Sequence, residues 1–169
     1  MSEIRKLPTE EEYKILEYLE EVKDPEIPVI SVVELGVVRA VVKEGNRVTV
    51  SITPTYTGCP AMRVMEEDII AKLHEKGFAD VVVKTVLSPA WTTDWMNDAA
   101  KEKLRVYGIA PPEKSTADKN VLLGHPKITK CPRCGSENTV MVSQFGSTAC
   151  KALWKCSDCL EPFDHFKCI

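Results

Sequence analysis

The sequence predicts a small two-layer α/β domain of the α+β type, followed by a cysteine-rich β ribbon. Apolar residues at helical spacing alternate with short valine-rich segments over most of the chain, the pattern of mixed helices and strands. Two Cys-x-x-Cys pairs lie near the C-terminus, after a stretch with prolines and mixed charges. The 169 residues, 44% of them hydrophobic, suffice for one modest core and a small appendage. We expect a domain over residues 1–110, a linker over 111–126 and the ribbon over 127–169.

The first predicted helix begins after Thr9, which forms a capping box with Glu12. Pro25 disfavours helical geometry at the preceding residue, so the helix should end near Lys23. Four apolar residues recur at helical spacing and should face the core: Ile15, Leu16, Leu19 and Val22.

A β-hairpin is predicted next, because two valine-rich segments, 37–43 and 47–53, flank Glu44-Gly45-Asn46. Apolar and polar residues alternate in the second segment, which indicates that one face is buried. A further strand over 80–87 is apolar enough to be central in the sheet.

Two more helices complete the expected α-β-β-α-β-α order. Pro60 suits the first position of a helix that Gly77 ends. Its buried residues should be Met62, Met65, Ile69 and Leu73. Thr93 is expected to cap the last helix, which ends at Gly108. The inward residues of that helix should be Met96, Ala99, Ala100, Leu104 and Tyr107.

The strongest chemical signal is the cysteine set Cys131, Cys134, Cys156 and Cys159. Each Cys-x-x-Cys pair can place two sulfurs on one ion, and two pairs complete the tetrahedral thiolate shell of a structural zinc site. Residues 135–155 between the pairs exceed the common zinc-ribbon spacing only slightly and contain two β-prone segments, 139–143 and 149–155. We expect a β zinc ribbon whose folding depends on the metal.

Two alternatives to zinc remain open at this point. A tetrathiolate shell also fits iron or an iron–sulfur cluster, and the four cysteines could be unligated. Two further cysteines, Cys150 and Cys168, fit buried apolar thiols, while their place beside a ribbon also suits auxiliary thiols for metal or sulfur handling.

In the N-terminal part, Cys59 is the candidate functional thiol. It should lie at a helix N-cap, where free backbone N–H groups and the helix dipole favour a thiolate. A loop from a strand to a helix is a common place for functional groups. Asp24 and Glu26 follow the first helix, and such carboxylates are most often solvated turn residues.

Charge and hydropathy exclude several classes of protein. The net charge of −3 disfavours nucleic-acid binding through bulk positive charge. Residues 1–8 show no secretory signal, and residues 29–42 are too often interrupted to span a membrane. Seven cysteines, an odd number, favour ligand or reactive thiols over disulfides. We expect a soluble, cytoplasmic protein.

Several motifs resemble those of a known family. In the N-terminal part they are Asp24-Pro25-Glu26-Ile27-Pro28, Val33-Glu34-Leu35-Gly36 and the segment 53–60. These are similar to the iron–sulfur assembly family that includes SufT and the cytosolic MIP-type targeting factors. The segments 131–135, 144–151 and 161–168 narrow the resemblance to PaaD-like accessory proteins, which are encoded with bacterial phenylacetyl-CoA epoxidase.

The resemblance implies an accessory factor, and not an enzyme, that matures an iron–sulfur cluster or iron centre of the epoxidase. The resemblance also implies that the client is the reductase subunit of the epoxidase and that Cys59 is the transfer thiol. Asp24 and Glu26 would form the family's acidic motif. Cys150 and Cys168 would be auxiliary thiols. One Cys59 per chain would need ligands from elsewhere to hold a cluster, which allows a homodimer.

Two other functions compete with this one. A zinc-ribbon module could bind protein or nucleic acid without cluster chemistry. A thiol enzyme would need a base beside Cys59, and the sequence shows none.

Overall fold

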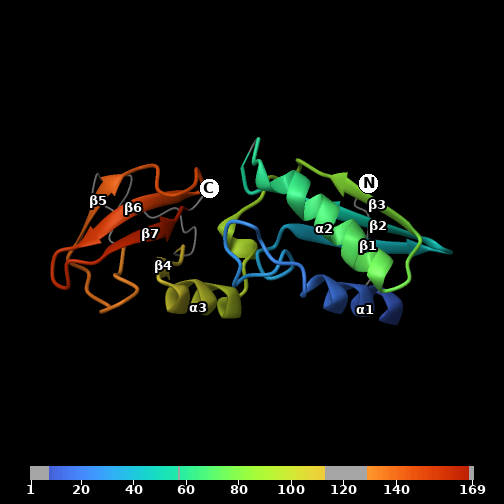
Figure 1. Ribbon diagram of the computed structural model, residues 1–169, viewed down its shortest axis with the longest axis horizontal. Coiled ribbons are helices and arrows are strands. Elements are labelled where there is room, and N and C mark those ends of the chain that lie inside the picture. The colour runs from blue at the N-terminus through green and yellow to red at the C-terminus, as the bar shows by residue number, and fades with distance from the viewer. Residues whose placement is uncertain (1–7, 57, 113–128, 168–169) are drawn as a thin grey trace. The chain divides into compact units, whose positions relative to one another are not determined.

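The computed structural model describes residues 8–56, 58–112 and 129–167. It divides into two compact units, Met1–Ala90 and Trp91–Ile169, each with its own sheet (Figure 1). Helices and strands mix in the described part of the chain, which confirms the predicted α+β class. None of the helices described is long and apolar enough to cross a membrane.

The first helix, α1 (Glu10–Leu19), begins with the predicted capping box between Thr9 and Glu12. Ile15 and Leu19 are buried, and Val22 is buried just beyond the helix. The helix ends at Leu19, before the expected Lys23. The N–H of Asp24 donates to the carbonyl of Ile30 (2.9 Å) instead of continuing the helix.

The sheet of the first unit has the order β1-β2-β3. Its strands β1 (Val38–Glu44) and β2 (Arg47–Ile52) form the predicted antiparallel hairpin, and β3 (Asp80–Thr85) pairs in parallel with β2. The central strand is therefore β2, and the prediction that residues 80–87 form the centre was wrong. Valine enrichment could not separate a central strand from an edge strand that a helix covers, and the valines of β3 are only half-buried.

Helix α2 (Ala61–Glu75) lies across this sheet (Figure 1). Pro60 takes the N-cap position, so the helix begins one residue later than expected and Cys59 precedes the cap. The core of the unit joins one face of both helices to one face of β2, with these side chains fully buried: Ile15, Leu19, Val48, Val50, Ile52, Ile69 and Leu73.

The second unit contains a 3-10 turn, η1 (Thr93–Trp95), and helix α3 (Asp98–Tyr107). Its sheet has the order β4-β7-β6-β5. The strands are β4 (Ile109–Ala110), β5 (Thr139–Ser143), β6 (Lys151–Cys156) and β7 (Pro162–Phe166). Strands β5 and β6 match the two predicted β-prone segments, whereas β4 and β7 were not predicted.

The last helix starts later than the sequence suggested. Met96 is extended (φ −73°, ψ 133°), and the side chain of Asn97, not Thr93, caps α3 by accepting from the N–H of Ala100 (2.7 Å). Ala100 and Leu104 are buried as predicted. Tyr107 and Ala99 are exposed, because the helix covers only a narrow strip of core.

The boundary between the units also differs from the expected one at residue 110. Helix α3 leads directly into β4, which pairs in parallel with β7, so the helix belongs to the unit of the ribbon. Most of the expected linker, from residue 113 on, lies outside the described residues.

Candidate metal and thiol sites

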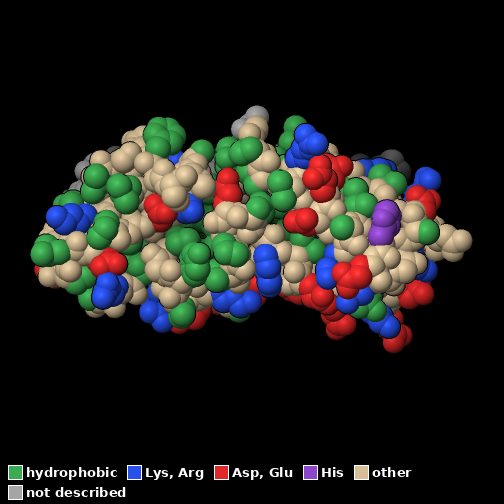
Figure 2. All heavy atoms as spheres, viewed as in Figure 1, with side chains coloured by type: hydrophobic (Ala, Val, Ile, Leu, Met, Phe, Trp, Pro, Cys, Tyr) green, Lys and Arg blue, Asp and Glu red, His purple; other side chains and the backbone are tan. Residues whose placement is uncertain are grey.

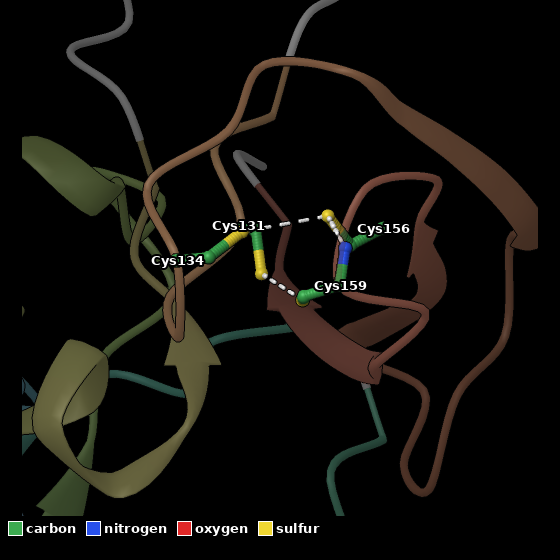
Figure 3. A group of neighbouring side chains, drawn as sticks. All are labelled: Cys131, Cys134, Cys156 and Cys159. Carbon is green, nitrogen blue, oxygen red and sulfur yellow. Dashed lines mark hydrogen bonds between the residues drawn. The ribbon is translucent and has the colours of Figure 1, made fainter.

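The four cysteines of the ribbon converge on one point, two from each of two turns (Figure 3). All four Sγ atoms lie within 4.8 Å of one another. The Sγ atoms of Cys131 and Cys159 are 3.7 Å apart, and those of Cys134 and Cys156 are 3.6 Å apart. The structure thus brings together the complete predicted ligand set.

The spacing of the sulfurs fits one tetrahedral ion. A metal–sulfur bond of about 2.3 Å gives a tetrahedron whose sulfurs lie about 3.8 Å apart. A disulfide would bring two sulfurs to about 2.05 Å, which the observed distances exclude for these pairs. Four thiols so close together leave room for a single ion at their centre.

Local backbone geometry brings the two cysteines of each turn together as a pair of metal ligands. In the first turn the N–H of Gly135 donates to the carbonyl of Cys131 (2.9 Å), and Gly135 has a positive φ of 76°, which favours glycine. In the second turn the N–H of Cys159 donates to the Sγ of Cys156 (3.5 Å). Leu160 then takes a φ of 65°, a position that glycine would fill more easily.

A polar network joins the two turns outside the sulfurs. Asp158, from the second turn, accepts from the Ser136 hydroxyl and from Nδ2 of Asn138 (2.8 Å). These bonds, the Ser136 bond first, lower the pKa of Asp158. Arg133 donates to Glu161 (2.6 Å) across the same gap. The network therefore helps to hold the two Cys pairs at the separation that one shared ion needs.

Without a cation, ionisation of one of these thiols disfavours ionisation of its neighbours. The N–H of Cys159 lowers the pKa of Cys156 to about 7. The N–H of Glu161 acts to lower the pKa of Cys159 as well, but burial and the other three cysteines outweigh it and raise that pKa to about 12. Four neighbouring thiols cannot all ionise together, and a divalent cation removes this repulsion.

The site has a buried side and an exposed side. Cys131 and Cys156 are buried in an apolar cluster, whereas Cys134 and Cys159 are exposed. The cluster consists of Ala110, Cys131, Ala152, Trp154, Cys156 and Phe163. A core this small gains much of its stability from the metal bonds that close it.

Cys59 is half-buried in the loop between β2 and α2. Its carbonyl accepts from the N–H of Met62 (3.3 Å), and its own N–H donates to Tyr56 (3.3 Å). The thiol therefore lies at the carboxyl end of β2, immediately before the helix. The predicted loop position is thus present, one residue outside the cap.

Two other segments pair with the chain where the Cys59 loop begins, at Ile52 and Thr53. The N–H of Thr53, where the loop begins, donates to the carbonyl of Val37 (2.9 Å), so the loop containing residues 24–37 lies beside it. The N–H of Val86 donates to Ile52 (2.8 Å), which brings the segment after β3 to the same place. The predicted hairpin implied the contact with Val37, whereas the parallel pairing of β3 with β2 could not be read from the sequence.

Asp24 is only 6% exposed, which contradicts the view of it as a solvated turn residue. Its Oδ1 accepts from the N–H groups of Glu26 (2.7 Å) and Ile27 (2.9 Å). Glu34 is also buried and accepts from the N–H of Ser31 (3.0 Å), whose hydroxyl in turn accepts from the N–H of Glu34 (3.0 Å). These carboxylates hold the loop in one shape, while the side chain of Glu26 is half-buried.

Of the expected auxiliary thiols, Cys150 is buried just before β6, and its Sγ lies 3.1 Å from the hydroxyl of Thr148. Cys168 lies outside the described residues. His165 received no role from its sequence context. The structure buries it on β7, edge-on to Trp154 with ring centroids 6.1 Å apart.

The fold and the sulfur site match two family models. Residues 12–86 match the model described as iron–sulfur cluster assembly protein, and residues 115–167 match the PaaD zinc beta ribbon domain. The domain DUF59 of Bacillus anthracis, a solved structure, has a TM-score of 0.51 at 31% identity and covers 55% of this chain and 90% of its own. The chain thus combines an iron–sulfur assembly fold with a zinc-ribbon fold.

Two curated relatives identify the family within this class of protein. An Escherichia coli K12 protein, described as a candidate component of 1,2-phenylacetyl-CoA epoxidase, is 46% identical over 157 residues, 93% of each chain. A Porphyromonas gingivalis protein, an Fe-S protein maturation auxiliary factor, is 38% identical over 100 residues, 58% of this chain and 92% of its own. This chain belongs to the PaaD family.

Proposed function

We propose that this protein is a non-catalytic accessory factor that matures an iron–sulfur cluster or iron centre of a multicomponent phenylacetyl-CoA epoxidase. The observation that carries the proposal is the position of Cys59, a half-buried thiol in the loop that joins the end of β2 to the start of α2. A single thiol in a loop suits transfer, because cargo held by few protein ligands is released as readily as it is accepted.

The relatives support a division of labour between the two units. The Porphyromonas gingivalis maturation factor is almost fully covered by 100 residues of alignment, so it is too short to contain both units. The model for iron–sulfur assembly matches the first unit of this chain. We place the transfer chemistry in that unit, on Cys59, with Asp24 and Glu26 shaping the neighbouring loop.

The ribbon unit is then a docking module closed by one structural zinc ion on Cys131, Cys134, Cys156 and Cys159. The matching family model is a zinc ribbon, and the sulfur spacing fits such an ion. Zinc suits a permanent site because it has no redox chemistry of its own. The reductase subunit of the epoxidase is the proposed client, in the cytoplasm, and a homodimer would supply a second Cys59 to a shared cluster.

The alternative of a nucleic-acid module is less well supported. Figure 2 shows acidic side chains gathered over the part of the first unit where α1 lies, and α1 has three glutamates in its first turn. A duplex would be repelled from this face. Binding to protein without cluster chemistry remains the alternative that the experiment below must separate.

The test is maturation of the client with Cys59→Ser. We expect the variant to keep its fold and one zinc per chain, while the iron and sulfide content of the co-expressed reductase subunit falls several-fold. Cys150→Ser, which removes the expected auxiliary thiol of the ribbon unit, is measured beside it, so that a loss in Cys59→Ser alone assigns the transfer to Cys59. A fully loaded client in the presence of Cys59→Ser would overturn the proposal and leave the docking role alone.

A further inference from the structure

A pocket of about 580 Å³ opens beside the first Cys-x-x-Cys turn and belongs wholly to the second unit. One wall is the last turn of α3 with the residues after it, and the opposite wall is the segment 129–135. The volume is typical of ligand-binding sites. Cys131 and Cys134 of the metal site are part of its lining, but no ligand has yet been assigned to the pocket itself.

The charged side chains described in its lining are all cationic: Arg105, Lys130 and Arg133. They are 50%, 66% and 68% exposed. Each has one carboxylate partner that is not part of the described lining: Arg105–Glu102 (2.6 Å), Lys130–Glu137 (3.2 Å) and Arg133–Glu161 (2.6 Å). Exposed ion pairs contribute only about 0–1 kcal/mol, so an incoming anion can replace these partners at little cost.

Thr129 supplies a second, independent sign of a ligand. It lines the pocket and is 3% exposed, and its Oγ1 has no hydrogen-bond partner in the described part of the chain. Its own carbonyl is engaged, since it accepts from the Thr139 hydroxyl (2.6 Å). Oγ1 has less than 1 Å² of accessible surface, so a ligand oxygen reaches it only when neighbouring lining side chains move; the bond then recovers the about 1–3 kcal/mol that a buried hydroxyl without a partner costs.

We propose that this pocket binds an acidic segment of a protein partner, whose carboxylates pair with Arg105, Lys130 and Arg133 and accept from Thr129. Pro111, Pro112 and other apolar lining residues offer contact for the aliphatic part of such a segment. The cations are too exposed to hold a small hydrated anion firmly, whereas a docked protein covers them and excludes water. The inference rests on the proposed docking role of the ribbon unit and names its contact.

The test is binding of the zinc-loaded full chain to a short fluorescein-labelled peptide of alternating glutamate and alanine, followed by anisotropy at low salt. The control peptide replaces each glutamate by glutamine. We expect the acidic peptide to bind at least tenfold more tightly. The double variant Lys130→Gln/Arg133→Gln should lose about tenfold of that affinity, while Lys155→Gln, an exposed lysine of β6 outside the pocket, should lose less than twofold.

Thr129→Val separates a specific site from general attraction of charge. The variant keeps every charge and the side-chain shape but removes the unpaired hydroxyl, so we expect unchanged zinc content, equal or higher thermal stability and severalfold weaker peptide binding. Equal binding of both peptides, equal losses in Lys155→Gln and the double variant, or full affinity in Thr129→Val would each overturn the inference. Binding of inorganic pyrophosphate, weakened by the double variant, without peptide binding would also overturn it in favour of a small anion. Because no cluster transfer is measured, these outcomes are independent of the Cys59→Ser result.

Discussion

Asp24 offers the sharpest test of how the motif loop works, because its side chain has a structural task that can be measured. Oδ1 accepts from two backbone N–H groups, at 2.7 and 2.9 Å, in a place where Asp24 is 6% exposed. Hydrogen bonds to a charged group contribute about 1.5–3 kcal/mol each, and water can replace part of that in a loop. We expect Asp24→Ala to destabilise the first unit by about 2–4 kcal/mol.

Asp24→Asn distinguishes the shape of the side chain from its charge. An amide oxygen can occupy the position of Oδ1 and accept both bonds, so the loss should be about 1 kcal/mol. If Asp24 acts only on loop shape, Asp24→Asn also keeps most of its client-maturation activity. If the carboxylate itself contacts the transferred iron, that activity falls although the fold is kept.

Urea unfolding can follow each unit separately in the same sample. Far-UV circular dichroism reports mainly α1 and α2, with a smaller part from α3, while the tryptophans Trp91, Trp95 and Trp154 all belong to the second unit. We expect the dichroism transition to move to lower urea in Asp24→Ala and the fluorescence transition to stay in place. An Asp24→Ala variant within about 0.5 kcal/mol of the parent would refute the structural account of this residue.

Two further predictions concern the ribbon. Cys131→Ser, or removal of the metal by a strong chelator, should abolish stoichiometric zinc and unfold the strands around Trp154. Elemental analysis measures the zinc, and the tryptophan emission maximum reports the unfolding. A native emission spectrum without metal would contradict the prediction. Gly146→Ala should destabilise the ribbon by about 1–2 kcal/mol, because a Cβ there would lie 2.5 Å from Oδ1 of Asp164. Thermal unfolding tests the second prediction. Gly45→Ala is the contrast, because its Cβ would meet nothing within 4 Å and its cost would come from a positive φ that Gly146 does not have.

Local rules of sequence were sufficient wherever the interaction spans only a few residues. The capping box of α1, the hairpin around Gly45 and the paired Cys-x-x-Cys turns all formed as predicted. In each case the partners are neighbours in the chain, or share a ligand chemistry that permits few arrangements. These features fixed the fold class and the ribbon.

Long-range pairing decided what local patterns could not. Strand β7 shows a weak alternation, with Phe163 and His165 buried, but only its pairing with β6 and β4 makes it a strand between two neighbours. The same pairing draws α3 into the ribbon unit. The sequence could not reveal this because strand partners are set by distant contacts.

The sequence by itself determined which sulfurs can share a metal and which thiol precedes a helix, because spacing and turn chemistry are local. Only the tertiary structure decided that Asp24 is a buried loop anchor, that β3 pairs in parallel with β2, and that Thr129 lines a cationic pocket. The physical reason is that burial and the convergence of charges depend on which distant segments exclude water together. A spacing pattern along one chain contains no record of that exclusion.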